Sequence, residues 1–314
     1  MPITLTDIRR AAERIQPLIH RTPVLTCETL NRKSGAKLFF KCENFQRAGA
    51  FKMRGAANAV LSLSESDRAK GVATHSSGNH GQALAKAAQS VGIPAYIVMP
   101  STAPEVKKRA VAEYGAEIVF CEPTLQARED TLAQVIARTE STFVHPYNNE
   151  QVITGQATAA LELIEDSEGL DAIMAPVGGG GLLSGTALSA HYLLPQAEVI
   201  AGEPAGADDA YQSLQVGQII PSEKPNTIAD GLLTSLGDKT FPIIQEYVKE
   251  IITVSDEEII AAMRLIWERM KIIIEPSCAV PLAALLKQAD DFAGKRVGII
   301  LTGGNVDLTS LPFS

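Results

Sequence analysis

The stretch GVATHSSGNHGQALAKAAQSVGIPAYIVMP, residues 71–100, decides the fold, because a strand, a helix and a second strand follow one another within it. GVATH and PAYIVMP are short apolar runs of the kind that form buried strands. Between them, HGQALAKAAQSVG has a helical pattern that ends in glycine. Two strands connected by a helix pair in parallel through a right-handed crossover, so the stretch predicts an α/β unit.

The same alternation continues to about residue 147. Pro104 can open a helix in its first turn, and Gly115 can close it. The pattern predicts helices over 104–116 and 124–140 and strands over 117–122 and 142–146. We therefore expect a small domain over residues 71–147.

A second set of strands lies on both sides of this unit in the sequence. Strands separated by helical stretches are predicted over residues 38–44, 171–177, 198–204, 250–255 and 296–302. We expect an α/β fold with two open, mainly parallel twisted sheets flanked by helices. The smaller domain would be inserted in a larger one that comprises residues 1–70 and 148–314.

The composition is that of a soluble globular protein that binds small molecules. Hydrophobic residues make up 46% of the 314 residues and charged residues 20%. The formal net charge is −8 and Lys and Arg are not clustered, so the electrostatic footprint of a nucleic-acid-binding protein is missing.

The cysteines and the N-terminus indicate the cytoplasm. Cys27, Cys42, Cys121 and Cys278 are scattered without a CxxC pair, which argues against a zinc site and against a disulfide framework. The first residues have no signal-peptide core, and no window approaches about eighteen apolar residues. We expect neither secretion nor membrane insertion.

Four successive glycines in PVGGGGLLSG, residues 176–185, follow a predicted strand and precede a predicted helix. Their backbone N–H groups can converge on an anion, and the helix adds the positive end of its dipole. The run lacks the Lys-Ser/Thr ending of a P-loop, so a phosphate group is expected there rather than a nucleoside triphosphate. A flexible turn is the alternative.

The loop SSGNHGQALA, residues 76–85, is a second strand-to-helix connection. Such connections face the ligand crevice of open α/β sheets, and their N–H groups can bind a carboxylate. Capping of the helix by Ser77 or Asn79 is compatible with this function, because both use the same unpaired donors. We expect His80 to shape the loop rather than to transfer protons.

GAFKMRGAANAV, residues 49–60, contains Lys52, which either extends from a helix surface or acts as a nucleophile. A lysine, a phosphate cradle and a carboxylate-binding loop together suggest a phosphorylated cofactor that reacts with amines and processes an amino acid.

GAFKMRGA, SSGNHGQALA, PVGGGGLLSG and LTGGN occur in this order. In these motifs, and over nearly its whole length, the chain resembles the fold type II pyridoxal-phosphate enzymes, and within them the serine racemase and serine/threonine dehydratase family. The resemblance implies that the large domain binds pyridoxal phosphate, that the small domain binds the substrate, and that the protein is a homodimer.

The resemblance also implies the cofactor site. Lys52 would form the Schiff base, with Phe51 beside the pyridine ring. The remaining cofactor-binding residues would be Asn79 at the ring hydroxyl, Thr302 at the pyridine nitrogen, and Gly178, Gly179, Gly180, Gly181 and Leu182 at the phosphate.

The implied reaction converts a β-hydroxy amino acid of the serine or threonine type to a 2-keto acid and ammonia, with serine racemisation as a second activity. Lys52 would remove the α-proton, and Ser77 would return a proton from the opposite face. The substrate-binding residues would be Ser76, Ser77, His80, Arg128 and Thr234.

A metal site is implied by the same resemblance. Glu203, the carbonyl of Ala207 and Asp209 would hold Mg²⁺ or Ca²⁺, and oxygen ligands suit either ion. An acidic surface turn is the alternative interpretation of these residues.

Departures from the family pattern leave the substrate open among serine, threonine and threo-3-hydroxyaspartate. Tyr147 stands where mammalian serine racemases have asparagine, and Ala50 stands where the family commonly has serine. Arg128 suits the second carboxylate of 3-hydroxyaspartate, although a helical arginine is usually solvated. Two alternatives remain. The protein could be a β-replacement enzyme of the cysteine synthase type, or a module that merely binds a phosphorylated ligand or an amino acid.

Overall fold

The computed structural model describes residues 2–313 and contains two mainly parallel sheets, which confirms the predicted fold class. The larger sheet has the order β1-β2-β10-β7-β8-β9, with strands Val24–Leu25, Lys37–Cys42, Arg296–Leu301, Ala172–Pro176, Glu198–Pro204 and Glu250–Val254. The smaller sheet has the order β5-β4-β3-β6, with strands Glu117–Cys121, Ala95–Pro100, Val72–His75 and Thr142–Phe143. Among these neighbours, only β1 and β2 pair antiparallel.

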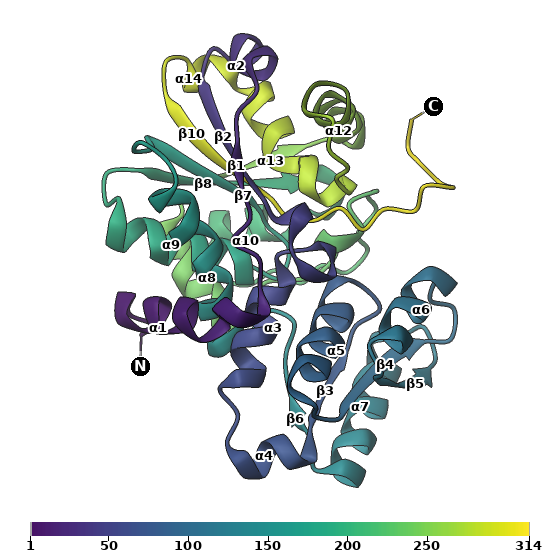
Figure 1. The fold of residues 1–314 in the computed structure, drawn as a ribbon. Helices are drawn as coiled ribbons and strands as arrows, with labels where there is room; N and C mark the ends of the chain where they lie inside the picture. The colour runs from purple at the N-terminus through teal and green to yellow at the C-terminus, as the bar shows by residue number, and fades with distance from the viewer. Residues whose placement is uncertain (1, 314) are drawn as a thin grey trace.

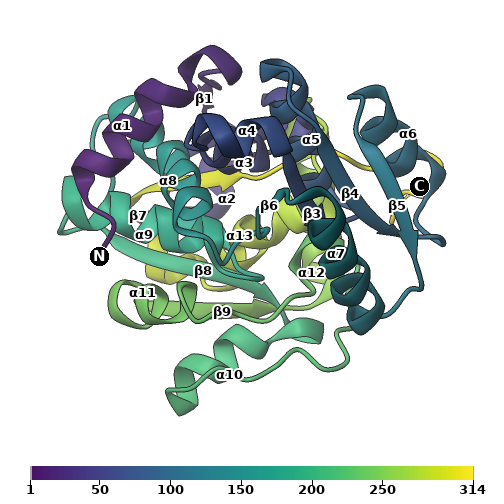
Figure 2. The same cartoon turned by 90° about the horizontal axis from the view of Figure 1, so that it is seen from below.

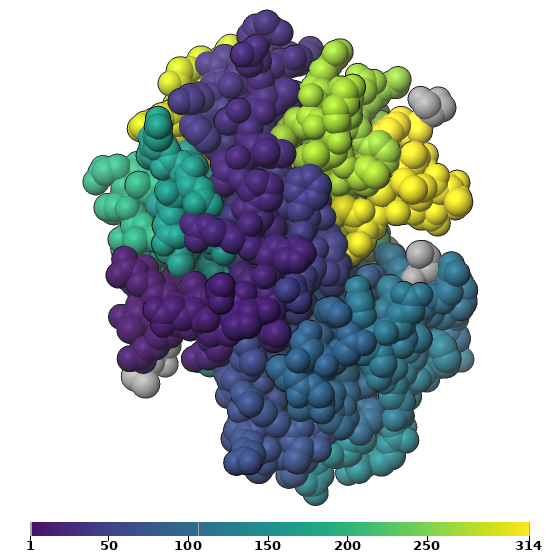
Figure 3. Space-filling model, in the orientation of Figure 1, coloured from purple at the N-terminus to yellow at the C-terminus, as the bar shows by residue number. Residues whose placement is uncertain are grey.

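The strands of the smaller sheet lie between residues 72 and 143, and strands of the larger sheet precede and follow them in the sequence, so the smaller unit is inserted in the larger one. The two units are separate in space, with the smaller one at the bottom of Figure 1 and the larger one at the top. Figure 3 shows the same division on the surface, where blue to teal residues cover the lower part. The exact domain bounds stay a prediction.

Two strands differ from the expectation. β6 ends at Phe143, although the sequence predicted a strand over 142–146. The chain turns there because Nδ1 of His145 accepts hydrogen bonds from the backbone N–H groups of Tyr147 and Asn148. β1 was not predicted, since two residues are too few to show a periodic pattern.

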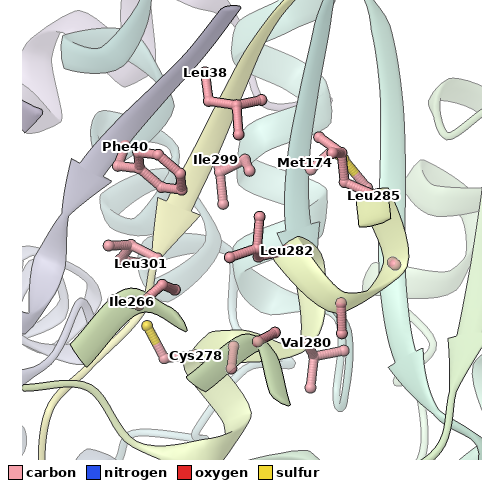
Figure 4. Close-up of a cluster of buried hydrophobic side chains, with 14 of the residues drawn as sticks. Leu38, Phe40, Met174, Ile266, Cys278, Val280, Leu282, Leu285, Ile299 and Leu301 are labelled. Carbon is pink, nitrogen blue, oxygen red and sulfur yellow. The ribbon is translucent and has the colours of Figure 1, made fainter. Parts of the chain in front are cut away.

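Helices cover both faces of the larger sheet (Figure 1). One face carries α2 (Glu28–Ser34), α12 (Asp256–Met270), α13 (Pro276–Lys287) and α14 (Ala289–Phe292). The other carries α8 (Glu150–Glu165), α9 (Gly181–Leu193) and α11 (Thr240–Tyr247), while α1 (Leu5–Ile15) packs on α8 and α10 (Asp209–Val216) lies beside β9. Figure 4 shows the core between the first face and α13, where Phe40, Ile299 and Leu282 lie together.

The smaller sheet is also covered on both faces, as Figure 2 shows from below. Val72 of β3 packs in the cluster that contains α5, and the next residue, Ala73, packs in the cluster that contains α7, because successive strand residues face opposite sides. The helices around this sheet are α4 (Glu65–Lys70), α5 (Asn79–Val91), α6 (Glu105–Glu113) and α7 (Leu125–Thr139).

Helix α3 (Lys52–Leu61) contacts both α5 and α8 and so joins the two units. Small residues permit the close approach, since a Cβ added to Gly155 of α8 would lie 2.7 Å from the Cα of Gly55. The side chain of Arg54, which is fully buried, donates hydrogen bonds to the carboxylates of Glu43 and Glu162. The N-terminal turn of α3, which carries Lys52, is therefore anchored to the segment that contains Glu43 and to α8, which contains Glu162.

Within residues 2–313, no helix has the length and apolar character that crossing a bilayer requires.

Candidate active site

Lys52 is the first residue of α3. The residues just before it contact the residues that directly follow the central strand β10. The backbone N–H of Phe51 donates to the carbonyl of Thr302 at 2.9 Å, and Ala50 forms an antiparallel bridge with Gly303. The GAFK and LTGG motifs, which lie about 250 residues apart in the sequence, are thereby held side by side.

The side chain of Lys52 is half-buried, and its amine lies in a weakly polar environment. Its Nζ donates to the carbonyl oxygen of Pro146 at 2.9 Å and lies 5.2 Å from the centroid of the Phe51 ring. Burial lowers the pKa of Lys52 to about 8, although the negative charge of Glu275 acts in the opposite direction. An appreciable share of this amine is uncharged near neutral pH, so it can act as a nucleophile or a base.

The glycine run forms the turn between β7 and α9. Gly180 has φ of +86°, which favours glycine, and a Cβ there would lie 2.8 Å from Ile244. A Cβ on Gly179 would collide with the ring of Tyr147. The turn therefore exposes backbone N–H groups at the start of a helix of 13 residues, as an anion site requires.

Tyr147 connects this turn to the lysine. It directly follows Pro146, whose carbonyl accepts from Lys52, and its backbone lies 3.1 Å from where a Cβ on Gly181 would be. Burial raises the pKa of the Tyr147 phenol, while a hydrogen bond with the side chain of Thr234 acts in the opposite direction. Thr234 is thus brought to the edge of the same site.

The residues present fit pyridoxal phosphate. The hydroxyl Oγ1 of Thr302 is buried and finds no hydrogen-bond partner within the part of the chain that the structure describes, so it is available for a ligand atom. A glycine cradle, an unpaired hydroxyl and a half-buried amine together match the phosphate, the pyridine nitrogen and the aldehyde of that cofactor.

The serine loop lies between β3 and α5. The hydroxyl of Ser76 accepts a hydrogen bond from the backbone N–H of Gly78 at 3.3 Å, and Ser77 lies between them. His80 is buried, and its Nε2 lies 3.0 Å from the carbonyl of Val144. Burial lowers the pKa of His80 to about 3, and the charge of Lys52 adds to this effect, so the ring is neutral and its contact with Val144 shapes the loop.

Arg128 lies in the first turns of α7 and is half-buried. Its Nε has no hydrogen-bond partner among residues 2–313. Burial is the main cause of the lowered pKa of His75, to which the positive charge of Arg128 contributes, so the guanidinium lies near the carboxyl end of β3. Arg128 thus lies near the end of β3 from which the serine loop begins.

The predicted metal ligands lie at the carboxyl end of β8. Glu203 is buried, and its carboxylate accepts the backbone N–H groups of Ala210 and Tyr211 at 2.9 and 2.8 Å. Oδ2 of Asp209 is buried without a hydrogen-bond partner in the described chain. Ala207 and Asp209 line a hollow of about 180 Å³. No group of three or more His, Cys, Asp or Glu side chains suited to a metal ion occurs within residues 2–313, so a cation here would need carbonyl or water ligands as well.

Two polar residues beside the site were missed in the sequence. Glu275 precedes Pro276 at the start of α13, and Asn305 follows the two glycines of LTGGN. Nδ2 of Asn79 donates to the carboxylate of Glu275 at 2.9 Å, and its Oδ1 accepts from Asn305 at 2.9 Å. The glutamate before a helix-starting proline was the available signal, but it is also a common capping pattern.

Comparison with known proteins identifies the family. The model of a family described as "Pyridoxal-phosphate dependent enzyme" matches residues 15–303. The chain is 55% identical over 311 residues to the beta-hydroxyaspartate dehydratase of Paracoccus denitrificans (strain Pd 1222), which covers 99% of each chain. It is 55% identical to the serine racemase of Dictyostelium discoideum, over 98% of this chain and 97% of that protein.

The fold agrees with these relatives. The crystal structure of serine racemase from Dictyostelium discoideum matches with a TM-score of 0.94 and covers 98% of this chain and 99% of that one. The predicted resemblance is confirmed. The chain therefore belongs to the pyridoxal-phosphate dependent enzyme family, in the fold type II group that contains serine racemases and dehydratases.

Proposed function

We propose that the protein is an ammonia-lyase that converts a β-hydroxy amino acid to a 2-keto acid and ammonia, and that it racemises serine at the same site. The observation that carries this proposal is the half-buried Lys52 side chain, whose amine has its pKa lowered to about 8, beside a glycine cradle and an unpaired Thr302 hydroxyl. The relatives include both a dehydratase and a racemase.

Pyridoxal phosphate, when bound, supplies an aldehyde that reacts with amines and a ring that withdraws electrons from the α-carbon of an amino acid. Gly178, Gly179, Gly180, Gly181 and Leu182 would bind its phosphate through backbone N–H groups. Phe51 would line the ring, Thr302 would hydrogen-bond to the pyridine nitrogen, and Asn79 to the ring hydroxyl.

Lys52 and Ser77 would divide the proton transfers. The uncharged amine of Lys52 takes the α-proton, for which a pKa near the working pH is well suited. Ser77 returns a proton from the opposite side when the α-carbon is inverted. Ser76 and the N–H groups of the serine loop orient the substrate carboxylate, and His80, as a neutral residue tied to Val144, keeps that loop in shape.

We propose 3-hydroxyaspartate as a second candidate substrate. Arg128 supports it, because its half-buried guanidinium has an unpartnered Nε in the described chain and can bind a second carboxylate bidentately. A relative of 55% identity is named beta-hydroxyaspartate dehydratase. Thr234, beside Tyr147, would contact the outer end of the substrate.

Three further assignments belong to this proposal. Glu203, Asp209 and the carbonyl of Ala207 would bind Mg²⁺ or Ca²⁺, supported by the unpaired Asp209 oxygen. The protein would act as a cytoplasmic homodimer. Residues 71–147 would form the substrate-binding domain, and residues 1–70 and 148–314 the cofactor-binding domain.

An assay of ammonia release and product chirality tests the proposed function. L- and D-serine, L-threonine and both threo-3-hydroxyaspartates would each be supplied with and without Mg²⁺ and without a thiol. Keto acid and ammonia from at least one of them, together with D-serine from L-serine, are expected. Turnover only when a thiol is added would indicate a β-replacement enzyme instead.

A further inference from the structure

Glu275 is a buried carboxylate beside the candidate active site to which the proposed function gives no role. The residue is 4% exposed and stands at the N-terminus of α13, where its backbone N–H donates to the carbonyl of Gly303 at 3.0 Å. A Cβ on Gly303 would lie 2.8 Å from Oε1 of Glu275, so the glycine of LTGGN leaves room for this carboxylate.

The carboxylate binds one side chain. Both of its oxygens accept from Nδ2 of Asn79, at 2.9 and 3.1 Å, and it forms no ion pair within residues 2–313. An ionised carboxylate can only accept hydrogen bonds, so the amide of Asn79 must turn its nitrogen toward Glu275.

The other end of the network is fixed in the same way. Nδ2 of Asn305 donates to the carbonyl of Ala48 at 2.8 Å, and that carbonyl also can only accept. The same nitrogen donates to Oδ1 of Asn79 at 2.9 Å. Two groups that can only accept, the Ala48 carbonyl and the Glu275 carboxylate, therefore determine the orientation of both amides between them.

We propose that Glu275 is a positioning residue for the cofactor: through the amide of Asn79 its charge presents an N–H group, and not the amide oxygen, to the ring hydroxyl of pyridoxal phosphate. This inference rests on the proposed function, in which Asn79 meets that hydroxyl. An N–H donor favours the ionised hydroxyl, and a chain of hydrogen bonds that ends on a carboxylate holds the donor in place.

The charge on Glu275 responds to pH near neutrality. Burial raises its pKa to about 7, and the negative charge of Asp230 adds to this rise. The hydrogen bond from Asn79 and the positive charge of Lys107 act against it. The other ionisable groups that face it are Lys52 of α3 and Cys278 of α13. Because the folded-state pKa is raised, the carboxylate is charged above about pH 7 and protonated below it. A protonated Glu275 can donate, and Asn79 then loses the group that fixes its orientation.

Glu275→Gln tests the proposal in the holoenzyme. Glutamine keeps the shape and can still accept from Asn79, but it has no charge and no proton to lose. The visible absorbance of the bound cofactor should change with pH around a midpoint of about 7 in the natural protein and lack that transition in the variant. We expect the variant to bind pyridoxal phosphate roughly tenfold more weakly, since hydrogen bonds to charged groups exceed neutral ones by about 1.4 kcal/mol.

Glu257→Gln is the matched control, because Glu257 is an exposed glutamate in the first turn of α12. It should keep the natural absorbance profile. A second readout needs no cofactor: in the apoprotein, the NMR signals of the Asn79 side-chain amide should titrate near pH 7 and should not do so in Glu275→Gln.

The outcomes separate this proposal from the proposed function. If the natural protein binds the cofactor at Lys52 but Glu275→Gln has an unchanged absorbance profile, the positioning role is wrong and the proposed function stands. If the variant does not fold, the NMR readout on the natural apoprotein still tests the proposal. An Asn79 side-chain amide that does not titrate near pH 7 there would overturn it. A chain that binds no pyridoxal phosphate overturns both.

Discussion

At the scale of single residues, the chemistry of Lys52 depends on the surroundings of its amine. A solvated lysine has a pKa of about 10.4 and is almost fully charged at neutral pH. Burial between Phe51 and Pro146 lowers the pKa of Lys52 to about 8. The amine is therefore uncharged often enough to attack a carbonyl carbon or to take a proton.

This pKa predicts the pH dependence of cofactor capture by the apoprotein. Only the uncharged amine reacts, so the rate of capture should rise about tenfold per pH unit below the pKa and level off above about pH 8. Stopped-flow absorbance after mixing with pyridoxal phosphate measures the rate. A rate that keeps rising to about pH 10 would show an ordinary, solvated lysine.

Ser77 and Lys52 are predicted to serve opposite faces of the substrate. In Ser77→Ala, racemisation should fail while elimination from at least one serine enantiomer continues, because Lys52 still removes its proton. Chiral chromatography of the products, together with a keto-acid assay, separates the two activities. Equal loss of both would contradict the division of roles.

The sequence indicated candidate site residues where an unusual residue type recurs at one place in the chain. It did not indicate residues whose roles depend on contacts with distant parts of the chain. Four glycines after a strand and before a helix are unusual and indicate an anion site, although a flexible turn was the alternative. Glu275 and Asn305 look ordinary in the sequence, and their link through Asn79 joins residues 196 and 226 positions apart. No local pattern can indicate such a network.

At the scale of elements, the turn between β7 and α9 packs tightly against the segment that follows β6, so a change in one must displace the other. Gly179 has no Cβ because the ring of Tyr147 occupies that space. In Gly179→Ala the ring must move, so we expect the affinity for pyridoxal phosphate to fall by about tenfold, as overpacking typically costs 1–3 kcal/mol.

The double variant Gly179→Ala with Tyr147→Ala is the matched control for this prediction. It removes the colliding ring and should recover part of the lost affinity, measured by fluorescence titration of the apoprotein. No recovery would mean that the added methyl group acts on the cofactor itself and not through Tyr147.

Helix α3 is held by a buried charge network behind the lysine. Arg54→Ala would leave the carboxylates of Glu43 and Glu162 buried without their main cation. We expect the free energy of unfolding to fall by about 3–5 kcal/mol in a urea titration. Arg264→Ala is the control: it breaks an exposed pair with Glu268 and should cost about 1 kcal/mol or less. Similar costs for both variants would contradict the anchoring role of Arg54.

At the scale of the whole molecule, the arrangement of two sheets was predictable because strands and helices alternate so regularly. The strands predicted from GVATH onward and those on both sides of them in the sequence are present in the two sheets, including the early strand β2, which pairs with the late strand β10. The turn at His145 was not predictable, because it depends on hydrogen bonds from backbone N–H groups two and three residues further on to the histidine ring, which no apolar pattern indicates. The short β1 has too few residues to show a periodic pattern.

The proposed metal site predicts a global effect on stability. Mg²⁺ that binds the folded state alone should stabilise it by about 2.7 kcal/mol at a hundred times its Kd. Differential scanning fluorimetry with and without the ion measures the shift in Tm. Asp209→Asn, which removes the unpaired carboxylate oxygen from the site, should abolish the shift. A shift that persists unchanged in this variant would argue against the site.

The central claim is that Lys52 binds the cofactor covalently, and peptide mapping after borohydride reduction tests it most directly. Reduction makes the bond between lysine and pyridoxal phosphate permanent, so mass spectrometry can locate it. We predict a single modified peptide that contains Lys52, and an unmodified, colourless Lys52→Ala protein. Modification of a different lysine, or none in the natural protein, would contradict the account.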